Sequence, residues 1–127
     1  MTSSNKGPRV LIVEDESLVR SIAHEEFADA GFDVVTAEDG RAAVDLLNGG
    51  DMFDLLFTDI RMPGTIDGWS VATAARRAHP DIAVIYATGF FEEPSAMVAD
   101  ARFFKKPYRL ATILEAARQL GVDPARG

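Results

Sequence analysis

The sequence of 127 residues contains no cysteine. Disulfide bonds, thiolate zinc sites and cysteine nucleophiles are therefore excluded. Positive charge is also scarce, since 13 lysines and arginines stand against 20 acidic residues and the formal net charge is −7. This balance argues against a surface for nucleic acid or an anionic membrane, because either would need a basic stripe. We expect neither as a partner.

Long apolar runs are missing as well. No stretch approaches the roughly 20 residues of a membrane-spanning helix, and residues 1–8 lack the apolar core of a secretory signal. We expect these eight residues to be a flexible lead-in and the protein to be cytoplasmic. A length of 127 residues with 47% hydrophobic and 26% charged residues suits one globular domain.

What the chain does contain is an alternation of short apolar segments with segments of helical periodicity. Continuous apolar strands separated by helices indicate a parallel sheet covered on both faces. We predict an α/β fold, a flavodoxin-like, doubly wound, five-stranded parallel sheet with strand order 2-1-3-4-5. The predicted strands are 9–13, 33–37, 53–59, 82–88 and 102–105, and the predicted helices are 17–30, 39–47, 68–78 and 108–120.

Several side chains are assigned to packing or to the surface. In the first helix, Val19, Ala23, Phe27 and Ala30 share one face, and we expect Leu18 and Ile22 to widen that buried face. The two histidines, His24 and His79, have no metal-ligand spacing, and we expect both at the surface. Trp69 opens the third helix, where we expect it to pack.

The strand order predicts a cluster of acidic side chains. Strands 1 and 3 are neighbours, and their carboxyl ends carry Glu14-Asp15 and Asp59. Two unit charges 4 Å apart interact by about 4 kcal/mol at an effective dielectric of 20, so the cluster would hold a proton unless a cation joins it. Oxygen ligands favour a hard divalent ion, Mg²⁺ first, with Mn²⁺ as an alternative. Asp59 could then act as a nucleophile and form an aspartyl-phosphate.

Two further residues are expected at the same edge of the sheet. Thr88 ends the fourth strand, and Lys106 follows the fifth strand, just before Pro107. A hydroxyl and an ammonium group are what a phosphoryl group needs as sensor and counter-charge.

Taken together, these segments resemble the receiver domain of bacterial two-component response regulators. The resemblance implies that Asp59 accepts a phosphoryl group from a histidine kinase or histidine phosphotransfer protein. It also implies that Glu14, Asp15, Asp59 and the backbone carbonyl of Arg61 hold Mg²⁺. The matching segments are VLIVEDE at 10–16, DIRMPG at 59–64, DG at 67–68, YATG at 86–89 and FFKKPY at 103–108.

The resemblance also implies which residues would couple phosphorylation to the binding of a partner. Thr88 and Lys106 would contact the phosphoryl group, and Phe103 falls at the family's switch aromatic position. Arg61 and Phe90 would border the phosphoryl group and lengthen its lifetime by excluding water. A downstream protein would bind the face formed by residues 89–101, the fifth strand and the last helix. Such a protein is a signalling switch and not an enzyme, although it supports its own Mg²⁺-dependent phosphotransfer and autodephosphorylation.

The sequence departs from the family pattern in three places. The first acidic position holds Glu14 where aspartate is more common, and the loop between Pro63 and Asp67 is one residue longer than usual. The separation of Thr88 from Lys106 is short, so we expect the fourth helix of the family to be short, displaced or replaced by a loop. The YATGF segment also resembles a receiver subgroup with a Phe-Ala-Thr-Gly-aromatic signature on this strand.

The same residues allow other interpretations. Residues 14–16 could be a solvated helix start, because acidic residues are favoured in a first turn. Phe103 and Phe104 alternate, so either could be the core residue. A pseudo-receiver that binds proteins without being phosphorylated is the main alternative function. It usually lacks the acidic pair, the aspartate or the lysine, all of which are present here.

The domain boundaries follow from the same segments. We expect the receiver domain to span 9–121 and residues 122–127 to be a tail too short for an output domain. The sequence leaves open whether the chain is complete or part of a longer protein.

Overall fold

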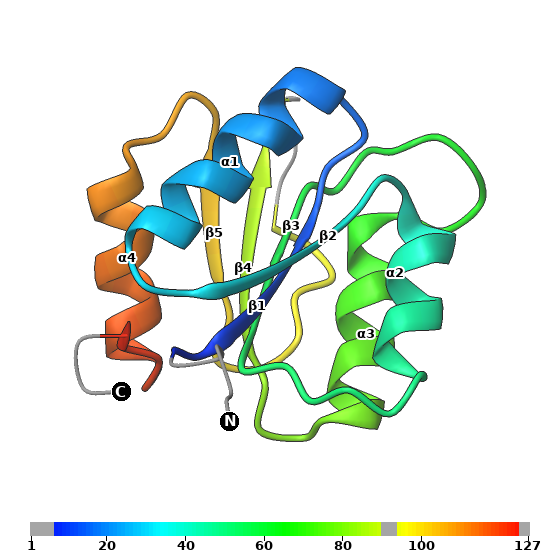
Figure 1. Cartoon of the computed structure of the whole chain (residues 1–127). Helices are drawn as coiled ribbons and strands as arrows, with labels where there is room; N and C mark the ends of the chain where they lie inside the picture. The colour runs from blue at the N-terminus through cyan, green and yellow to red at the C-terminus, as the bar shows by residue number, and fades with distance from the viewer. Residues whose placement is uncertain (1–6, 90–93, 125–127) are drawn as a thin grey trace.

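The computed structural model describes residues 7–89 and 94–124 and contains one five-stranded parallel sheet. The strand order is β2-β1-β3-β4-β5, as predicted (Figure 1). The strands are β1 (Arg9–Val13), β2 (Asp33–Ala37), β3 (Leu55–Thr58), β4 (Ala83–Thr88) and β5 (Arg102–Lys105). The helices are α1 (Ser17–Asp29), α2 (Gly40–Leu47), α3 (Gly68–Ala78) and α4 (Leu110–Gln119).

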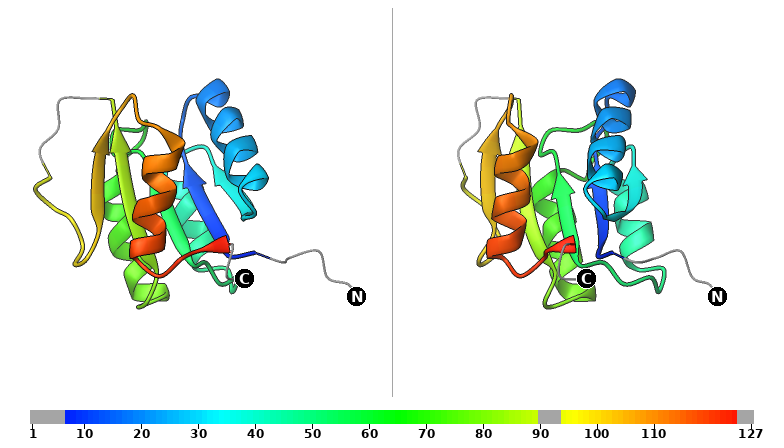
Figure 2. Two further views of the ribbon diagram at one scale, coloured as in Figure 1. Left: turned by 90° about the vertical axis from the view of Figure 1, so that its left-hand side faces the viewer. Right: turned by 60° about the vertical axis from the view of Figure 1, so that its left-hand side comes forward.

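The helices cover the sheet on both faces. Figure 2 shows α1 and α4 together on one side and α2 and α3 on the other. Each face has its own apolar core, one around Phe27 and Phe57 and the other around Leu11 and Leu56. Neighbouring residues of a strand therefore belong to different cores, because successive side chains point to opposite faces.

Local sequence explains where two of the helices begin. The carboxylate of Asp39 accepts a hydrogen bond from the Ala42 amide at 2.9 Å, and that of Asp67 accepts one from the Ser70 amide at 3.0 Å. Both aspartates are N-caps, and each satisfies an amide that has no partner inside its helix. Asp39 thus precedes α2, whereas the sequence predicted it as the first helical residue.

The crossover from β4 to β5 departs from the strand–helix alternation, as the sequence predicted. Within its described part, residues 94–101, the chain forms turns and no helix. Figure 2 shows this segment passing outside the β5 edge of the sheet. Across the described ranges of the chain, no helix has the length and apolar character needed to cross a membrane.

The prediction that Leu18 and Ile22 widen the buried face of α1 is wrong. Leu18 is 72% exposed and Ile22 is 50% exposed, whereas Ala23 and Phe27 are buried. Each residue of a helix is rotated by about 100° from the one before it, so Leu18 and Ile22 are turned away from the stripe that faces the sheet. The first turn of α1 also projects beyond the strand ends (Figure 1), where there is no sheet for Leu18 to cover.

The prediction of a surface position is confirmed for His24 and wrong for His79. His79 is only 7% exposed, lies just after α3 and packs edge-on against the ring of Phe53 at 6.2 Å. Neither of its ring nitrogens has a hydrogen-bond partner. A buried polar atom without a partner costs free energy, so His79 is a weak point of this core.

We expect His79→Leu to stabilise the protein. The substitution removes two buried nitrogens without partners and keeps an apolar side chain against Phe53, so the free energy of unfolding should rise by about 1 kcal/mol. Urea unfolding followed by circular dichroism measures this change. His24→Leu, at an exposed position, is the matched control and should change stability little. A less stable His79→Leu protein would show that the imidazole is satisfied in solution.

Candidate functional site

The carboxyl ends of β1 and β3 bring the predicted acidic residues together. The two strands are paired in parallel with Val13 opposite Thr58, so Glu14 and Asp59 are the next residues along. The Asp59 amide continues this pairing by donating to the Val13 carbonyl at 3.0 Å. Glu14, Asp15 and Asp59 each place a carboxylate oxygen within 4.8 Å of the other two. The predicted convergence is confirmed.

Lys106 bridges two of these carboxylates. Its ammonium donates to Glu14 Oε1 at 2.7 Å and to Asp59 Oδ2 at 3.0 Å. Both acidic side chains are 7% exposed, whereas that of Lys106 is 23% exposed. The lysine therefore offsets part of the negative charge and holds the start of the β5–α4 connection against the ends of β1 and β3.

Burial shifts the pKa values of two of these groups. Burial raises the pKa of Glu14, although its hydrogen bonds with Lys106 and the Glu16 amide act in the opposite direction. Burial also disfavours the Lys106 ammonium, but the hydrogen bonds to Glu14 and Asp59 and their charges outweigh it and raise the pKa of Lys106. Lys106 therefore stays charged at neutral pH and remains a counter-ion for the cluster.

The remaining oxygens of Glu14 and Asp59 are bound to the backbone. Asp59 Oδ1 accepts a hydrogen bond from the Ile60 amide at 2.6 Å, and Glu14 Oε2 accepts one from the Glu16 amide at 3.2 Å. These bonds fix the direction in which each carboxylate points. Such positioning limits the rearrangement needed when a ligand arrives.

Arg20 is a residue of the site that sequence reasoning missed. From α1 it donates to the backbone carbonyl of Glu14 at 2.9 Å and reaches that of Asp15 at 3.5 Å. It thereby supports the loop that carries the acidic pair. The signal that could have found it is an arginine near the start of a helix that begins right after an acidic run.

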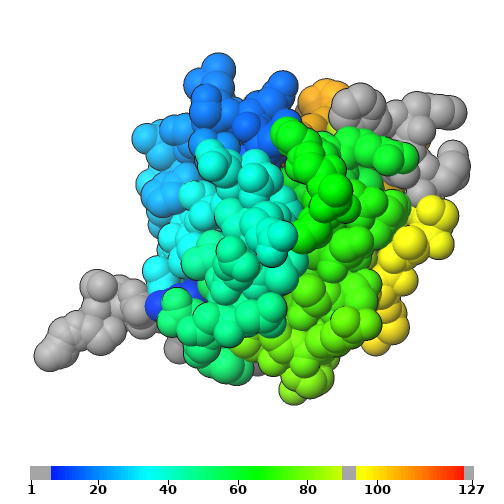
Figure 3. Space-filling model, turned by 90° about the vertical axis from the view of Figure 1, so that its right-hand side faces the viewer, coloured from blue at the N-terminus to red at the C-terminus, as the bar shows by residue number. Residues whose placement is uncertain are grey.

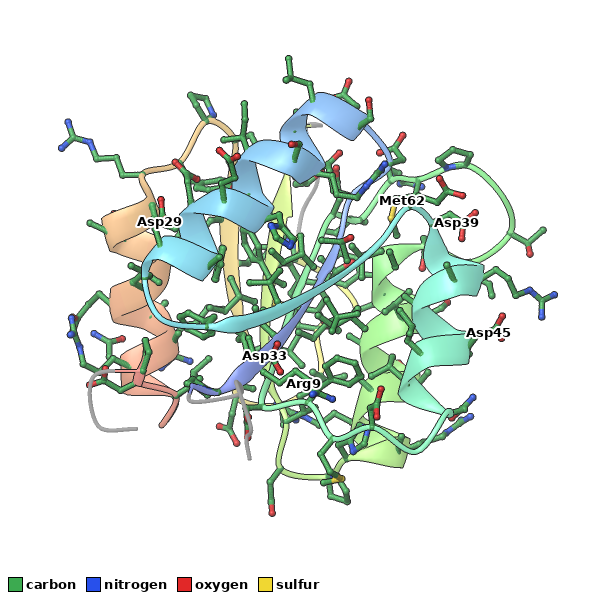
Figure 4. All side chains as sticks on the ribbon, in the orientation of Figure 1. Arg9, Asp29, Asp33, Asp39, Asp45 and Met62 are labelled. Atoms are coloured by element: carbon green, nitrogen blue, oxygen red, sulfur yellow. The ribbon has the colours of Figure 1, made fainter. Side chains whose placement is uncertain are left out.

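The site opens to solvent as a cleft of about 480 Å³. Residues 14–16 form one wall and residues 61–63 form another, with Asp59, Gly89 and Lys106 between them. Figure 4 places Met62 at this upper end of the sheet, whereas the ion pair of Arg9 with Asp33 lies toward the opposite end. The cleft gives a small phosphoryl donor, or a side chain from another protein, access to Asp59.

The other predicted site residues differ in burial and in their place relative to this cleft. Thr88 is completely buried at the end of β4, and its carbonyl accepts a hydrogen bond from the Lys106 amide at 2.8 Å. Arg61 is exposed and lines the cleft. Phe103 and Phe104 are both half-buried, but they pack into the cores on opposite faces of the sheet. Phe90 lies outside the described residues.

The acidic cluster fits a hard divalent cation. Three carboxylates from two neighbouring strands supply oxygen ligands alone, which is the ligand set that Mg²⁺ prefers. With one lysine bridging two of the three carboxylates, the group is left with excess negative charge for a cation to neutralise.

The sequence and the fold were compared with known proteins. The sequence model of a family described as "Response regulator receiver domain" matches residues 10–118. A response regulator receiver protein, CpdR from Brucella abortus, is 29% identical over 88% of this chain and 95% of its own length. The sensor kinase CckA of the same organism is 32% identical over 87% of this chain, which spans only 12% of that kinase.

Solved structures give the same result. A response regulator receiver protein from Sinorhizobium medicae has a TM-score of 0.86 and 32% identity, with 92% of this chain and 96% of that chain covered. The response regulator protein TrrA from Thermotoga maritima, solved in complex with Mg²⁺ and BeF, has a TM-score of 0.77 and 29% identity, with 89% and 98% covered.

We expect Lys106→Met to destabilise the protein. It leaves Glu14 and Asp59 without their shared ammonium, and breaking this bridge should lower the free energy of unfolding by about 2 kcal/mol, less than for a fully enclosed pair because the cleft is open to water. Millimolar Mg²⁺ should restore much of this loss, because a bound cation replaces the missing charge.

Urea unfolding with and without Mg²⁺ measures both effects. Lys105→Met, at the neighbouring exposed lysine, is the matched control and should change stability by no more than about 0.5 kcal/mol. An unchanged Lys106→Met protein, or one that Mg²⁺ does not stabilise, would contradict the electrostatic account of the site.

Proposed function

This chain belongs to the response regulator receiver domain family, and we propose that it is a phosphoacceptor switch in which Asp59 receives a phosphoryl group with the help of Mg²⁺. Receiver domains are signalling switches of two-component systems. The observation that carries the proposal is the Asp59 carboxylate, held by Lys106 at 3.0 Å in an open cleft beside two further carboxylates.

The transfer itself is a substitution at phosphorus. An Asp59 oxygen forms an O–P bond while the N–P bond of the donor's phosphohistidine breaks, and the imidazole leaves with that electron pair. Lys106 stabilises the charge on the transferring oxygens from its position beside Asp59. Glu14, Asp15, Asp59 and the Arg61 carbonyl would hold Mg²⁺, which supplies further positive charge at the phosphoryl oxygens. The donor is a histidine kinase or a histidine phosphotransfer protein.

The proposed output face consists of residues 94–101, β5 and α4. An open cavity of about 430 Å³ between β5 and α4 supports it, with Arg102 and Phe104 on one side and Ala111, Thr112 and Glu115 on the other. An open, partly apolar cavity on an edge strand is a surface that a protein partner can fill. Several expectations from the sequence stay predictions. They are the roles of Arg61 and Phe90 in phosphate lifetime, the subgroup resemblance, the domain boundaries, the cytoplasmic location and the lack of nucleic-acid or membrane partners.

We expect incubation with Mg²⁺ and acetyl phosphate to add one phosphoryl group, which intact mass detects. Asp59→Asn should abolish the adduct because it removes the nucleophilic oxygen, and EDTA should abolish it by removing the cation. Asp51→Asn, at an exposed aspartate, is the matched control and should leave the adduct unchanged. If the parent protein takes no phosphoryl group from acetyl phosphate or from a phosphorylated histidine kinase, the pseudo-receiver interpretation replaces this one.

Thr88 is proposed to sense the new group. A phosphoryl group adds about −1.5 to −2 charges and three acceptor oxygens, and the Thr88 hydroxyl lies on the residue next to the cleft-lining Gly89. Thr88→Ala should accept the phosphoryl group but show smaller amide shift changes on phosphorylation, measured by nuclear magnetic resonance. Thr88→Ser keeps the hydroxyl and should respond like the parent. Equal responses in all three proteins would remove Thr88 from the switch.

A further inference from the structure

Three aromatic side chains from different elements meet in the apolar core on the α2–α3 face of the sheet. The ring of Trp69, at the start of α3, stacks on that of Phe103 in β5, with centroids 6.3 Å apart and planes inclined by 12°. Trp69 also packs against Tyr86 in β4 at 4.8 Å. Such pairs contribute about 0.5–1.5 kcal/mol each beyond the apolar area they bury. Trp69 therefore links α3 to two strands at once.

The start of α3 is bound to the backbone of Ile60 and packs closely against that of Asp59. The Gly68 amide donates to the Ile60 carbonyl at 2.8 Å. A Cβ added at Gly68 would lie 2.1 Å from the Asp59 carbonyl oxygen, so no other residue fits this approach. Trp69 follows directly, and its backbone is therefore held at a constant position relative to Asp59.

A second connection runs from Phe103 back to Asp59. Phe103 lies three residues before Lys106, and β5 pairs with β4 so that Thr88 stands opposite Lys105. Lys106 binds Asp59 Oδ2 at 3.0 Å. The contacts thus form a closed ring that leaves Asp59 through Gly68 and Trp69, crosses to Phe103 and returns through Lys106.

The crossover segment 94–101 is attached to this ring through Tyr86. Tyr86 is completely buried, and its hydroxyl oxygen accepts a hydrogen bond from the Val98 amide at 3.1 Å. Met97 and Val98 pack against the same apolar core as Trp69 and Phe103. Figure 3 shows this segment along the edge of the face formed by α2 and α3, beside α3.

We propose that Trp69 is a positioning residue that transmits the state of the Lys106–Asp59 bridge to segment 94–101. α3 is fixed at Asp59, whereas β5 moves with Lys106, so a change in the bridge shifts Phe103 against Trp69. The shift reaches Tyr86, which Trp69 also contacts, and from there the hydrogen bond to Val98. This role rests on the proposed function in assigning phosphorylation as the natural trigger, but the coupling itself exists without a phosphoryl group.

A double-mutant cycle without any phosphodonor tests the coupling. The hydrogen-exchange rate of the Val98 amide is measured by nuclear magnetic resonance in the parent, Lys106→Met, Trp69→Leu and the double variant. With Trp69 present, Lys106→Met should speed Val98 exchange by about threefold or more, whereas in the Trp69→Leu background the effect should largely disappear, since coupled residues are not additive. Equal factors in the two backgrounds would overturn the proposal.

Two further variants keep the test decisive. Trp69→Phe retains a ring against Phe103 and should preserve the coupling, which separates positioning from loss of packing and serves if Trp69→Leu fails to fold. Tyr86→Phe removes the hydroxyl alone and should make Val98 exchange fast and insensitive to Lys106→Met. A Tyr86→Phe protein in which Val98 still responds to Lys106→Met would contradict the route through Tyr86.

A last experiment tests the role of Trp69 in the phosphorylated protein. Trp69→Leu should take up the phosphoryl group to the same extent as the parent by intact mass, yet lose most of the change in Val98 exchange that phosphorylation causes. Trp69 is the single tryptophan of the chain, so its emission in the parent should also change with the adduct. If the parent takes no phosphoryl group, the proposed function fails, and the cycle without donor still decides the role of Trp69.

Discussion

Carboxylates repel one another, and this fold brings three of them within 4.8 Å at the carboxyl edge of its sheet. Two unit charges 4.8 Å apart repel each other by about 3.5 kcal/mol at an effective dielectric of 20. The structure tolerates the cost because the parallel pairing of β1 with β3 fixes the backbone and because Lys106 lies between Glu14 and Asp59. The remaining negative charge is available to a divalent cation, so the stability of the fold and the chemistry of the site depend on the same unbalanced charge.

The same charge balance explains why phosphorylation of Asp59 would affect other parts of the molecule. Lys106 divides its hydrogen bonds between two carboxylates, and a phosphoryl group would add about −1.5 to −2 charges within its reach. The ammonium would have to redistribute its bonds. Lys106 directly follows the edge strand β5, which pairs with β4 alone, so the redistribution acts on a strand that is held by one neighbour only. A local change in charge is in this way coupled to the surface of the molecule.

Sequence reasoning succeeded where the signal was local or followed from topology. The strand order and the convergence of Glu14 with Asp59 required only apolar runs and the geometry of parallel sheets. It failed where tertiary contacts decide burial. His79 follows a helix and reads as a surface residue, but Phe53 covers it. Leu18 is apolar, which predicts a core residue, but its side chain is 72% exposed. Arg20 binds backbone carbonyls, and its place after the acidic run is only a weak sequence signal for that contact.

Two features of this chain bear on β5, namely the crossover without a helix in its described part and the side chain of Glu14. The crossover before β5 contains no helix in its described part, residues 94–101. Glu14 is one methylene longer than aspartate, and this length lets one oxygen reach Lys106 at 2.7 Å while the other accepts from the Glu16 amide at 3.2 Å. Through Lys106, the Glu14 side chain holds the carboxyl end of β5 close to that of β1. Its second hydrogen bond, to the Glu16 amide, stabilises the loop after β1. Trp69 holds the middle of the same strand through Phe103. These two side-chain contacts add to the backbone pairing of β5 with β4, and one of them depends on the charge state of the site itself.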